Sequence, residues 1–206
     1  AQLSVGATLD QFELRPWNEN PYIAVKEAVL PFNKFPDESI FLSPEMKSTG
    51  EVMGISKTLG VAFRKASIGA GNILPSTGTV FVSVNDSDKL EILNIARDFF
   101  ELGFNLIGTE GTATLLKKNG LPAKQVFKVG EGRPNIVDEI KNKKINLVIN
   151  TPMGSRSRYD EQEIGRSCIR YGILAVTTLS GANAVLRAIR SSSDSKKVQS
   201  LQEYYS

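Results

Sequence analysis

The chain has 206 residues, 41% of them apolar and 23% charged, and its formal net charge is +3. Its lysines and arginines are scattered, and no apolar run approaches the ~18 residues that span a bilayer, so we expect neither nucleic acid nor a membrane as a partner. A small anionic ligand fits the mild positive charge better. Because the sequence contains no histidine, Ser-His and Cys-His catalysis and the commonest zinc ligand are excluded.

The N-terminal stretch "AQLSVGATLDQF" has no basic leader followed by an apolar core. We therefore expect no secretory or transit signal, and the missing initial methionine suggests a piece of a longer chain. The lone cysteine, Cys168, has no partner for an internal disulfide, which fits the reducing cytoplasm. Its neighbours "EIGRSCIRYG" have a helical pattern, so we expect a small packed thiol there.

The first 75 residues have an irregular pattern that is broken by prolines. "YIAVKEAVLPFNKFP" predicts a strand and then a proline turn, residues 43–71 predict a loop and a helix, and "NILPSTG" predicts a linker. We place a domain boundary near Pro75, between an annex of residues 1–75 and a unit of residues 76–206. The annex is too small to bury much apolar surface alone, so we expect it to pack on the larger unit or on chain outside this sequence.

From residue 79 onward, short apolar runs alternate with amphipathic ones. In the first amphipathic run, apolar residues recur from Ile92 to Phe99 at helical spacing, with Asp86 or Ser87 as the expected cap and Gly103 as the end. The expected strands are residues 79–84, 104–108, 124–129, 145–150 and a run centred on Leu174. The expected helices follow them, at residues 86–103, 109–119, 136–144, 160–172 and 180–192.

Five strands separated by helices predict a doubly wound α/β domain, with a parallel sheet and helices on both faces. Ligands of such sheets bind outside the carboxyl ends of the strands. In this sequence those ends carry polar, glycine-rich stretches: "VND", "IGTEGT", "VGEGRP", "INTPMG" and "TTLSGA". We therefore expect the functional residues to gather at this edge.

The turn from Thr109 to Thr112 enters a predicted helix and has free amides and two hydroxyls, which together suit a phosphate. The alternative is simple helix capping. Lys89, Lys128 and Asn150 with Thr151 follow other strands and are predicted to lie at the same edge. Each has a plainer interpretation, as a solvated lysine, an exposed strand lysine or a turn cap, and it is their convergence that favours a ligand.

We find no convincing pair of titratable groups for catalysis at this edge. Asp86, Glu110 and Glu131 are the best placed carboxylates, but their contexts also suit caps and solvated loops. The Gly-x-Gly-x-x-Gly fingerprint of dinucleotide-binding folds does not occur. Arg156 and Arg158 either close over a ligand or belong to an exposed loop. Binding without turnover is the better prediction.

Two stretches of the annex, "AVKEAVLPFNKFP" and "LSPEMKSTGEVMG", resemble the end of the second ATP-grasp half of carbamoyl phosphate synthetase large subunits. The stretches "FVSVNDSDK", "GTEGTA", "KVGEGRPNI" and "INTPMG" are similar to the methylglyoxal-synthase-like regulatory domain of that family. The resemblance implies that residues 1–75 are a small α+β tail of the ATP-grasp domain. It also implies that residues 76–206 are the allosteric domain.

Large subunits of this family make carbamoyl phosphate from bicarbonate, two ATP molecules and ammonia, which a glutamine amidotransferase small subunit supplies. The product feeds arginine and pyrimidine synthesis in the cytoplasm. The resemblance implies that the ligands for ATP and for Mg or Mn lie upstream of this chain. We therefore expect no cofactor here and no catalysis by this chain alone.

In bacterial relatives this domain binds UMP or IMP through the nucleotide phosphate. The residues at matching positions are Lys89, Thr109, Thr112, Lys128 and Asn150. The next position of that loop is often threonine, but it is Pro152 in this chain.

Relatives that respond to ornithine bind it where the two parts meet, and Glu27 and Thr177 match two positions of that site. Ala175 and Val176 replace other members, which weakens the match. The domain also mediates oligomerisation in the family.

Two alternatives remain. The first is a lyase of the methylglyoxal synthase type that acts on a triose phosphate, although that family uses a histidine and an aspartate which this chain lacks at matching places. The second is an oligomerisation module that senses no effector.

Overall fold

The computed structural model describes residues 1–13, 21–29, 50–151, 158–191 and 199–205. The predicted proline turn after residue 29, the start of the predicted loop before residue 50, Pro152, Arg156 and the side chain of Arg158 lie outside this description.

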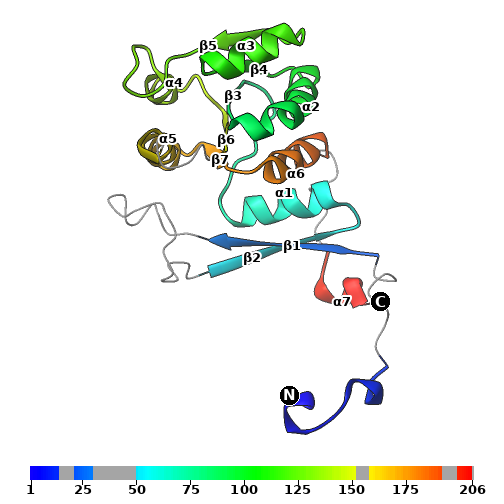
Figure 1. The fold of residues 1–206 in the computed structure, drawn as a ribbon. Helices are drawn as coiled ribbons and strands as arrows, with labels where there is room; N and C mark the ends of the chain where they lie inside the picture. The colour runs from blue at the N-terminus through cyan, green and yellow to red at the C-terminus, as the bar shows by residue number, and fades with distance from the viewer. Residues whose placement is uncertain (14–20, 30–49, 152–157, 192–198, 206) are drawn as a thin grey trace.

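The larger unit is a five-stranded parallel sheet in the order β5-β4-β3-β6-β7, so the predicted doubly wound α/β fold is confirmed. Figure 1 shows the sheet between its helices. The strands are β3 (Thr79–Ser83), β4 (Asn105–Gly108), β5 (Ala123–Gln125), β6 (Leu147–Asn150) and β7 (Leu174–Val176). The helices are α2 (Lys89–Glu101), α3 (Glu110–Lys118), α4 (Ile136–Lys141), α5 (Arg158–Tyr171) and α6 (Leu179–Arg190).

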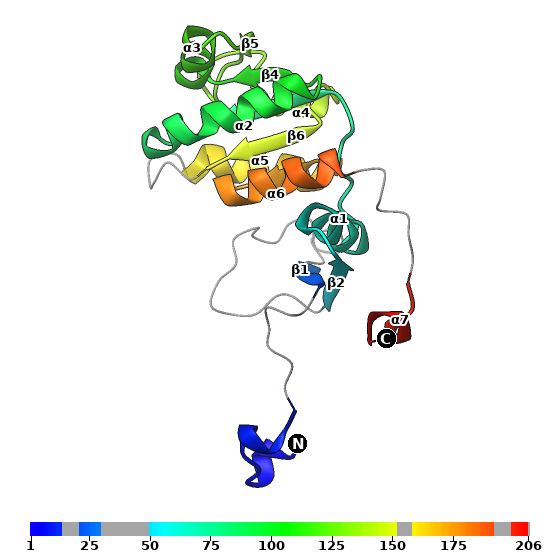
Figure 2. The ribbon, with the colours of Figure 1, turned by 90° about the vertical axis from the view of Figure 1, so that its right-hand side faces the viewer.

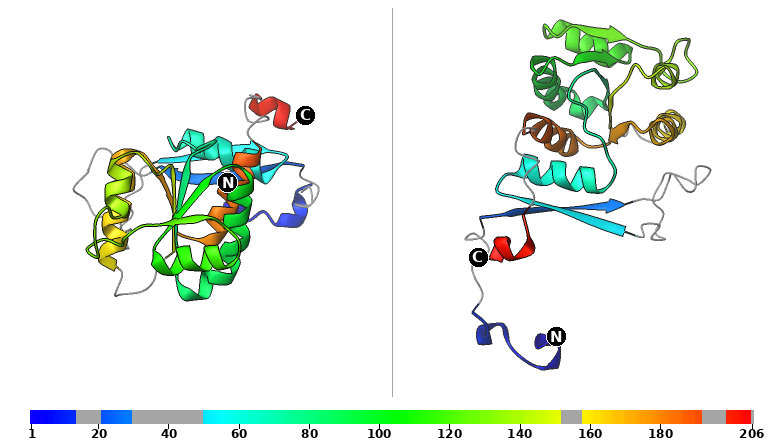
Figure 3. Two further views of the ribbon diagram at one scale, coloured as in Figure 1. Left: turned by 90° about the horizontal axis from the view of Figure 1, so that it is seen from above. Right: turned by 180° about the vertical axis from the view of Figure 1, so that it is seen from behind.

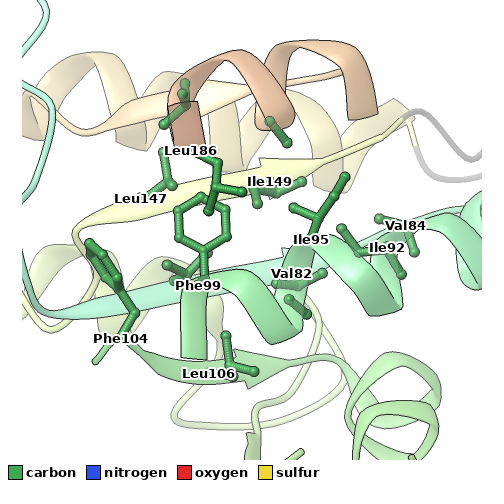
Figure 4. Packing of buried hydrophobic residues seen from close by; sticks show 14 of the residues in the cluster. Val82, Val84, Ile92, Ile95, Phe99, Phe104, Leu106, Leu147, Ile149 and Leu186 are labelled. Carbon is green, nitrogen blue, oxygen red and sulfur yellow. The ribbon is translucent and has the colours of Figure 1, made fainter. Parts of the chain in front are cut away.

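The two faces of the sheet are covered by different helices because side chains alternate along each strand. On β3, Val80 and Val82 belong to a core cluster shared with α2, α3 and α6, whereas Phe81 belongs to a cluster shared with α4 and α5. Figure 4 shows the first cluster, with Ile95 and Phe99 of α2 over the sheet. Figure 3 shows the sheet between the two sets of helices.

The strand expected at residues 124–129 is shorter than predicted, because β5 ends at Gln125. Among the described residues β5 pairs with β4, which ends at Gly108, where the chain turns into α3. Beyond Gln125 only an isolated bridge of Phe127 with Asn135 follows in that part of the chain. Val126 still donates its amide to the Gly108 carbonyl at 2.9 Å. Lys128 therefore lies in a turn, not at the end of a strand as expected, and its carbonyl accepts from the Glu131 amide at 3.3 Å.

The predicted caps at Asp86 and Ser87 are wrong. A 3-10 turn, η4 (Asp86–Asp88), precedes α2, and Asn85 caps it by accepting the Asp88 amide through its side chain at 3.1 Å. The capping residue thus lies before both predicted caps, because the 3-10 turn adds three residues ahead of the α-helix. The predicted helix end at Gly103 is confirmed, since this glycine has φ of +88°.

The N-terminal part contains 3-10 turns η1 (Leu3–Val5) and η2 (Leu9–Gln11), strands β1 (Ile23–Val29) and β2 (Gly50–Ser56), and helix α1 (Leu59–Gly69). The predicted loop is wrong for residues 50–56, which pair antiparallel with β1 along its full length. Local sequence hides this strand, because it contains two glycines and its partner is distant in the chain. Gly54 lies so close to Ala62 of α1 that a β-carbon would collide with that residue's carbonyl oxygen.

The annex packs on the α/β unit through α1 and α6, as expected (Figure 2). A β-carbon on Gly60 of α1 would lie 2.5 Å from the Arg187 carbonyl oxygen, so the two helices approach closely. Arg64 donates from Nη1 to the Ala188 carbonyl at 3.5 Å. The C-terminal helix α7 (Leu201–Tyr205) returns to the annex, where the Tyr204 hydroxyl donates to the Ile55 carbonyl at 3.3 Å. Within the described ranges no helix has the length and apolar character that crossing a bilayer requires.

Candidate functional site

A pocket of about 320 Å³ opens at the carboxyl edge of the sheet, where the sequence places its polar loops. It brings together Thr109, Lys128 and Asn150, three of the predicted site residues, from the ends of β4 and β6 and the turn after β5. The full lining is Ser83, Thr109, Lys128, Val129, Glu131, Ile136, Asn150, Asp160, Glu161 and Ile164.

The first turn of α3 begins at Thr109, which lines this pocket, and its amides are unused. Thr109 is the N-cap residue, but its side chain makes no capping hydrogen bond. Among the described residues, the amides of residues 110–112 find no acceptor, because the first bond of the helix is donated by Ala113 to the Thr109 carbonyl. A β-carbon on Gly111 would meet nothing within 4 Å, so the space beside this residue is open. A helix N-terminus with free amides and open space suits an anion.

The two predicted cations are each already paired with a carboxylate three residues away. The Lys128 ammonium lies 3.5 Å from the Glu131 carboxylate, and both residues line the pocket. The Lys89 ammonium lies 2.6 Å from the Asp86 carboxylate, and Lys89 is not part of the lining. An incoming anion would therefore replace Glu131 as the partner of Lys128. Lys89 would first have to move toward the pocket before it could bind the same anion.

Thr112 and Thr151 do not line the pocket. Thr112 is only 3% exposed in the first turn of α3. Thr151 is 2% exposed, and its hydroxyl oxygen accepts the Asn85 amide at 3.1 Å. The Thr151 side chain thus joins the loop after β6 to the cap of the turn before α2. In this arrangement the Thr151 hydroxyl holds the backbone of Asn85 in place. For a ligand at the helix N-terminus, the backbone amide of Thr112 is more accessible than its buried hydroxyl.

Two carboxylates of the pocket, Asp160 and Glu161, were not predicted from the sequence. They lie in the first turn of α5, which follows β6 and therefore begins at the same edge. Acidic residues are typical of a first helical turn, so this pattern alone gave no sign of a pocket. Burial raises the pKa of Asp160; Lys128 opposes the shift, and Glu131 and Glu161 add to it.

The pocket is therefore lined by groups of both positive and negative charge. One ammonium and free amides favour an anion, while three carboxylates suit hydrogen-bond donors such as sugar hydroxyls. Among the described residues, no acidic, histidine or cysteine side chains gather closely enough to hold a metal ion. Cys168 supplies no reactive thiolate near neutral pH, since burial raises the pKa of its thiol to about 12.

The two residues of the predicted second site have different surroundings. Glu27 accepts hydrogen bonds from the Ser67 hydroxyl at 3.1 Å and from the Asn72 amide at 2.6 Å. Thr177 is exposed after β7. Glu27 thus holds β1 to α1 and to the chain after it. Its role toward a ligand stays a prediction.

Comparison with known proteins gives the family. Residues 91–177 match the MGS-like domain, from the first turn of α2 to the residue after β7. The carbamoyl phosphate synthase large chain of Nostoc sp. strain PCC 7120 is 48% identical over 200 residues, which are 97% of this chain and 18% of that protein. The chain belongs to the carbamoyl phosphate synthase large-chain family. The resemblance inferred from the sequence motifs is thereby confirmed.

Other large chains of this family match along nearly the same length. That of Archaeoglobus fulgidus is 46% identical over 207 residues, covering 100% of this chain and 19% of its own. The "C-terminal section" of the large chain of Aquifex aeolicus is 48% identical over 193 residues, covering 91% and 36%. The chain thus spans less than a fifth of the two complete large chains. A crystal structure of methylglyoxal synthase from Elizabethkingia anophelis NUHP1 is similar with a TM-score of 0.46 and 19% identity, covering 55% of this chain and 79% of that one.

Proposed function

We propose that this chain is a regulatory section of a glutamine-dependent carbamoyl phosphate synthase large chain and that its carboxyl-edge pocket binds a nucleoside monophosphate of the UMP or IMP type. The observation that carries the proposal is the union, in one pocket, of the open N-terminus of α3 with Lys128 and Asn150. These are the groups that the sequence predicted for a phosphate.

The chemistry of the pocket supports this ligand class. The phosphate takes the free amides of residues 110–112 and the ammonium of Lys128, which gives up Glu131. The ribose hydroxyls are donors for the carboxylate of Glu131, which a bare phosphate would leave facing an anion. The volume of about 320 Å³ lies at the lower end of the range of small-molecule sites, roughly 300 to 1,000 Å³.

The rest of the proposal concerns the whole protein. Carbamoyl phosphate synthesis for arginine and pyrimidines takes place on parts of the large chain outside this section, in the cytoplasm. ATP and Mg or Mn bind to those parts, and a glutamine amidotransferase small subunit associates with the complete chain. The section alone has no catalytic activity, and nucleotide binding to it tunes the activity of the whole.

Isothermal titration of the chain with UMP and IMP tests the proposal. We expect one nucleotide per chain, and Lys128→Ala should weaken binding by roughly 10- to 150-fold, since a lost charged hydrogen bond costs about 1.5 to 3 kcal/mol. Lys57→Ala is the matched control, because Lys57 is exposed between β2 and α1 and is not part of the pocket lining. Absence of heat with both nucleotides would overturn the proposal.

The two alternatives have their own readouts. Turnover of dihydroxyacetone phosphate would favour a lyase. Self-association in size-exclusion chromatography, together with flat nucleotide titrations, would favour an oligomerisation module.

A further inference from the structure

A second and larger hollow, of about 500 Å³, opens at the amino edge of the sheet. It is separated from the carboxyl-edge pocket by the length of the strands. Thr79 at the start of β3 lines this hollow, and Ser83 at its end lines the other pocket, so roughly 13 Å of strand lies between them. The lining is Thr79, Phe100, Asn105, Leu106, Ile107, Lys117, Pro122, Ala123, Lys124, Glu139, Lys144 and Ile145.

The lining is predominantly apolar. Leu106, Ala123 and Ile145 belong to the buried core and reach the hollow at the starts of β4 and β5 and just before β6. Phe100, near the end of α2, is 42% exposed beside them. An exposed aromatic ring next to an apolar hollow is a surface that gains free energy when a ligand covers it. The apolar body of a ligand therefore has a place in this hollow.

The charged groups of the hollow favour a negative ligand. Lys117 and Lys124 are exposed, and neither has a carboxylate partner among the described residues. The single carboxylate, Glu139, has a side chain only 3% exposed and pairs with Lys144 at 3.3 Å. The carboxyl-edge pocket has the opposite balance, since its lysine is paired and its carboxylates are in excess.

We propose that the amino-edge hollow binds a small organic anion with an apolar body, such as an aromatic or alicyclic carboxylate or sulfonate. The ring lies against Phe100 and the apolar lining, and the anionic group takes the ammonium groups of Lys117 and Lys124. A bare phosphate fits less well, because it has no apolar body to cover Phe100 and the apolar lining. The site does not depend on the function proposed for the carboxyl-edge pocket.

The test uses 8-anilinonaphthalene-1-sulfonate, an aromatic sulfonate whose fluorescence rises in apolar surroundings. We expect one dye per chain and at least tenfold weaker binding to the double variant Lys117→Gln/Lys124→Gln. The matched control is Lys26→Gln/Lys57→Gln, which removes the same charge from exposed positions of the annex and should bind as the parent does. Equal affinity of the two double variants would overturn the proposal.

Two further measurements locate the dye. Amide chemical shifts in ¹H-¹⁵N spectra should move at Asn105, Ala123 and Lys124 and stay unchanged at Thr109 and Asn150. Excess UMP should not displace the dye. The variant Phe100→Ser, at an exposed position, should weaken binding without loss of the folded spectrum. Shifts confined to the carboxyl edge or to β1 and β2 would contradict the assignment.

Discussion

The Cys168 thiol is shielded by its surroundings in the cluster between the sheet, α4 and α5, where it is 1% exposed. Burial raises its pKa from 9.0 to about 12, because the thiolate would lose its hydration. We predict that a thiol reagent such as dithionitrobenzoate does not modify the native chain at pH 8 and modifies one thiol after unfolding in denaturant. Modification of the native chain at the rate of a free thiol would contradict this burial.

The same shift predicts a loss of stability in alkali. Above pH 9 the unfolded thiol ionises while the folded thiol stays protonated, so the unfolded state binds fewer protons and the free energy of unfolding falls. The loss approaches about 1.4 kcal/mol for each pH unit between 9 and 12. Urea unfolding at pH 8, 9 and 10 should therefore show a steeper decline for the parent chain than for Cys168→Ala, which cannot ionise. Parallel declines would argue against the shift.

Asp160 limits the affinity of the carboxyl-edge pocket for anions, since its carboxylate shares the pocket with Glu131 and Glu161. We predict that Asp160→Asn tightens UMP binding by roughly three- to tenfold at pH 7, because a like charge near the phosphate is removed while a hydrogen-bonding side chain is kept. Isothermal titration measures the change. Glu163→Gln on the same helix is the control, because Glu163 pairs with Arg166 and is absent from the pocket lining. Equal gains in both variants would indicate a general charge effect.

At the residue scale, the sequence predicted those site residues that follow strands directly. Thr109 and Asn150 were found because the ends of parallel strands meet at one edge, and the structure brings them together. Lys128 reaches the same pocket from a turn, although its strand was predicted too long. Asp160 and Glu161 were missed because their first-turn position is typical of any helix. The hydroxyl of Thr151 bonds the Asn85 amide, a contact between two loops that no local pattern indicates.

At the element scale, the contact of α1 with α6 depends on the missing side chain of Gly60. An alanine there would place its β-carbon 2.5 Å from the Arg187 carbonyl and the Ser191 hydroxyl oxygens, so the helices would have to separate. We predict that Gly60→Ala lowers the free energy of unfolding by roughly 1 to 3 kcal/mol in urea titrations.

Gly111→Ala is the matched control for that substitution. Gly111 is also helical, but an added β-carbon meets no atom within 4 Å, so its stability should stay equal or rise by up to about 1 kcal/mol. Equal stability of the two variants would contradict the tight packing of α1 on α6.

The elements of the α/β unit were predictable because the spacing of apolar residues is typical of a strand or of a helix in each of them. The alternation of strands and helices along the chain then predicts a parallel sheet. Strand β2 was not predictable in this way. Its seven residues include Gly50 and Gly54, and they become a strand only through pairing with β1 and packing under α1. The end of β5 is likewise set by its neighbour β4 and not by its own alternation.

At the scale of the whole molecule, three contacts among the described residues join the annex to the α/β unit. Helix α1 packs on α6, Tyr204 of the C-terminal helix bonds Ile55 of β2, and Leu74 from the connecting chain enters the core of the sheet with only 7% exposure. Helix α1 brings Phe63 against the core of the larger unit, and the connecting chain buries Leu74 in that core. The predicted boundary near Pro75 therefore cuts just after a residue that stabilises the larger unit.

This placement predicts a difference between two fragments, residues 76–206 and residues 73–206. Both should fold, because they contain the sheet and, apart from Leu74 in the shorter fragment, both core clusters. The longer one should be more stable by about 1.5 to 3 kcal/mol, the gain from burying one leucine side chain. Urea unfolding followed by circular dichroism measures the difference. Leu74→Ala in the longer fragment should remove most of it, which separates the leucine from the rest of the added segment. If fragment 76–206 were unfolded, the annex and the α/β unit would form one folding domain, because the α/β unit would then need the contact of α1 with α6 in order to fold.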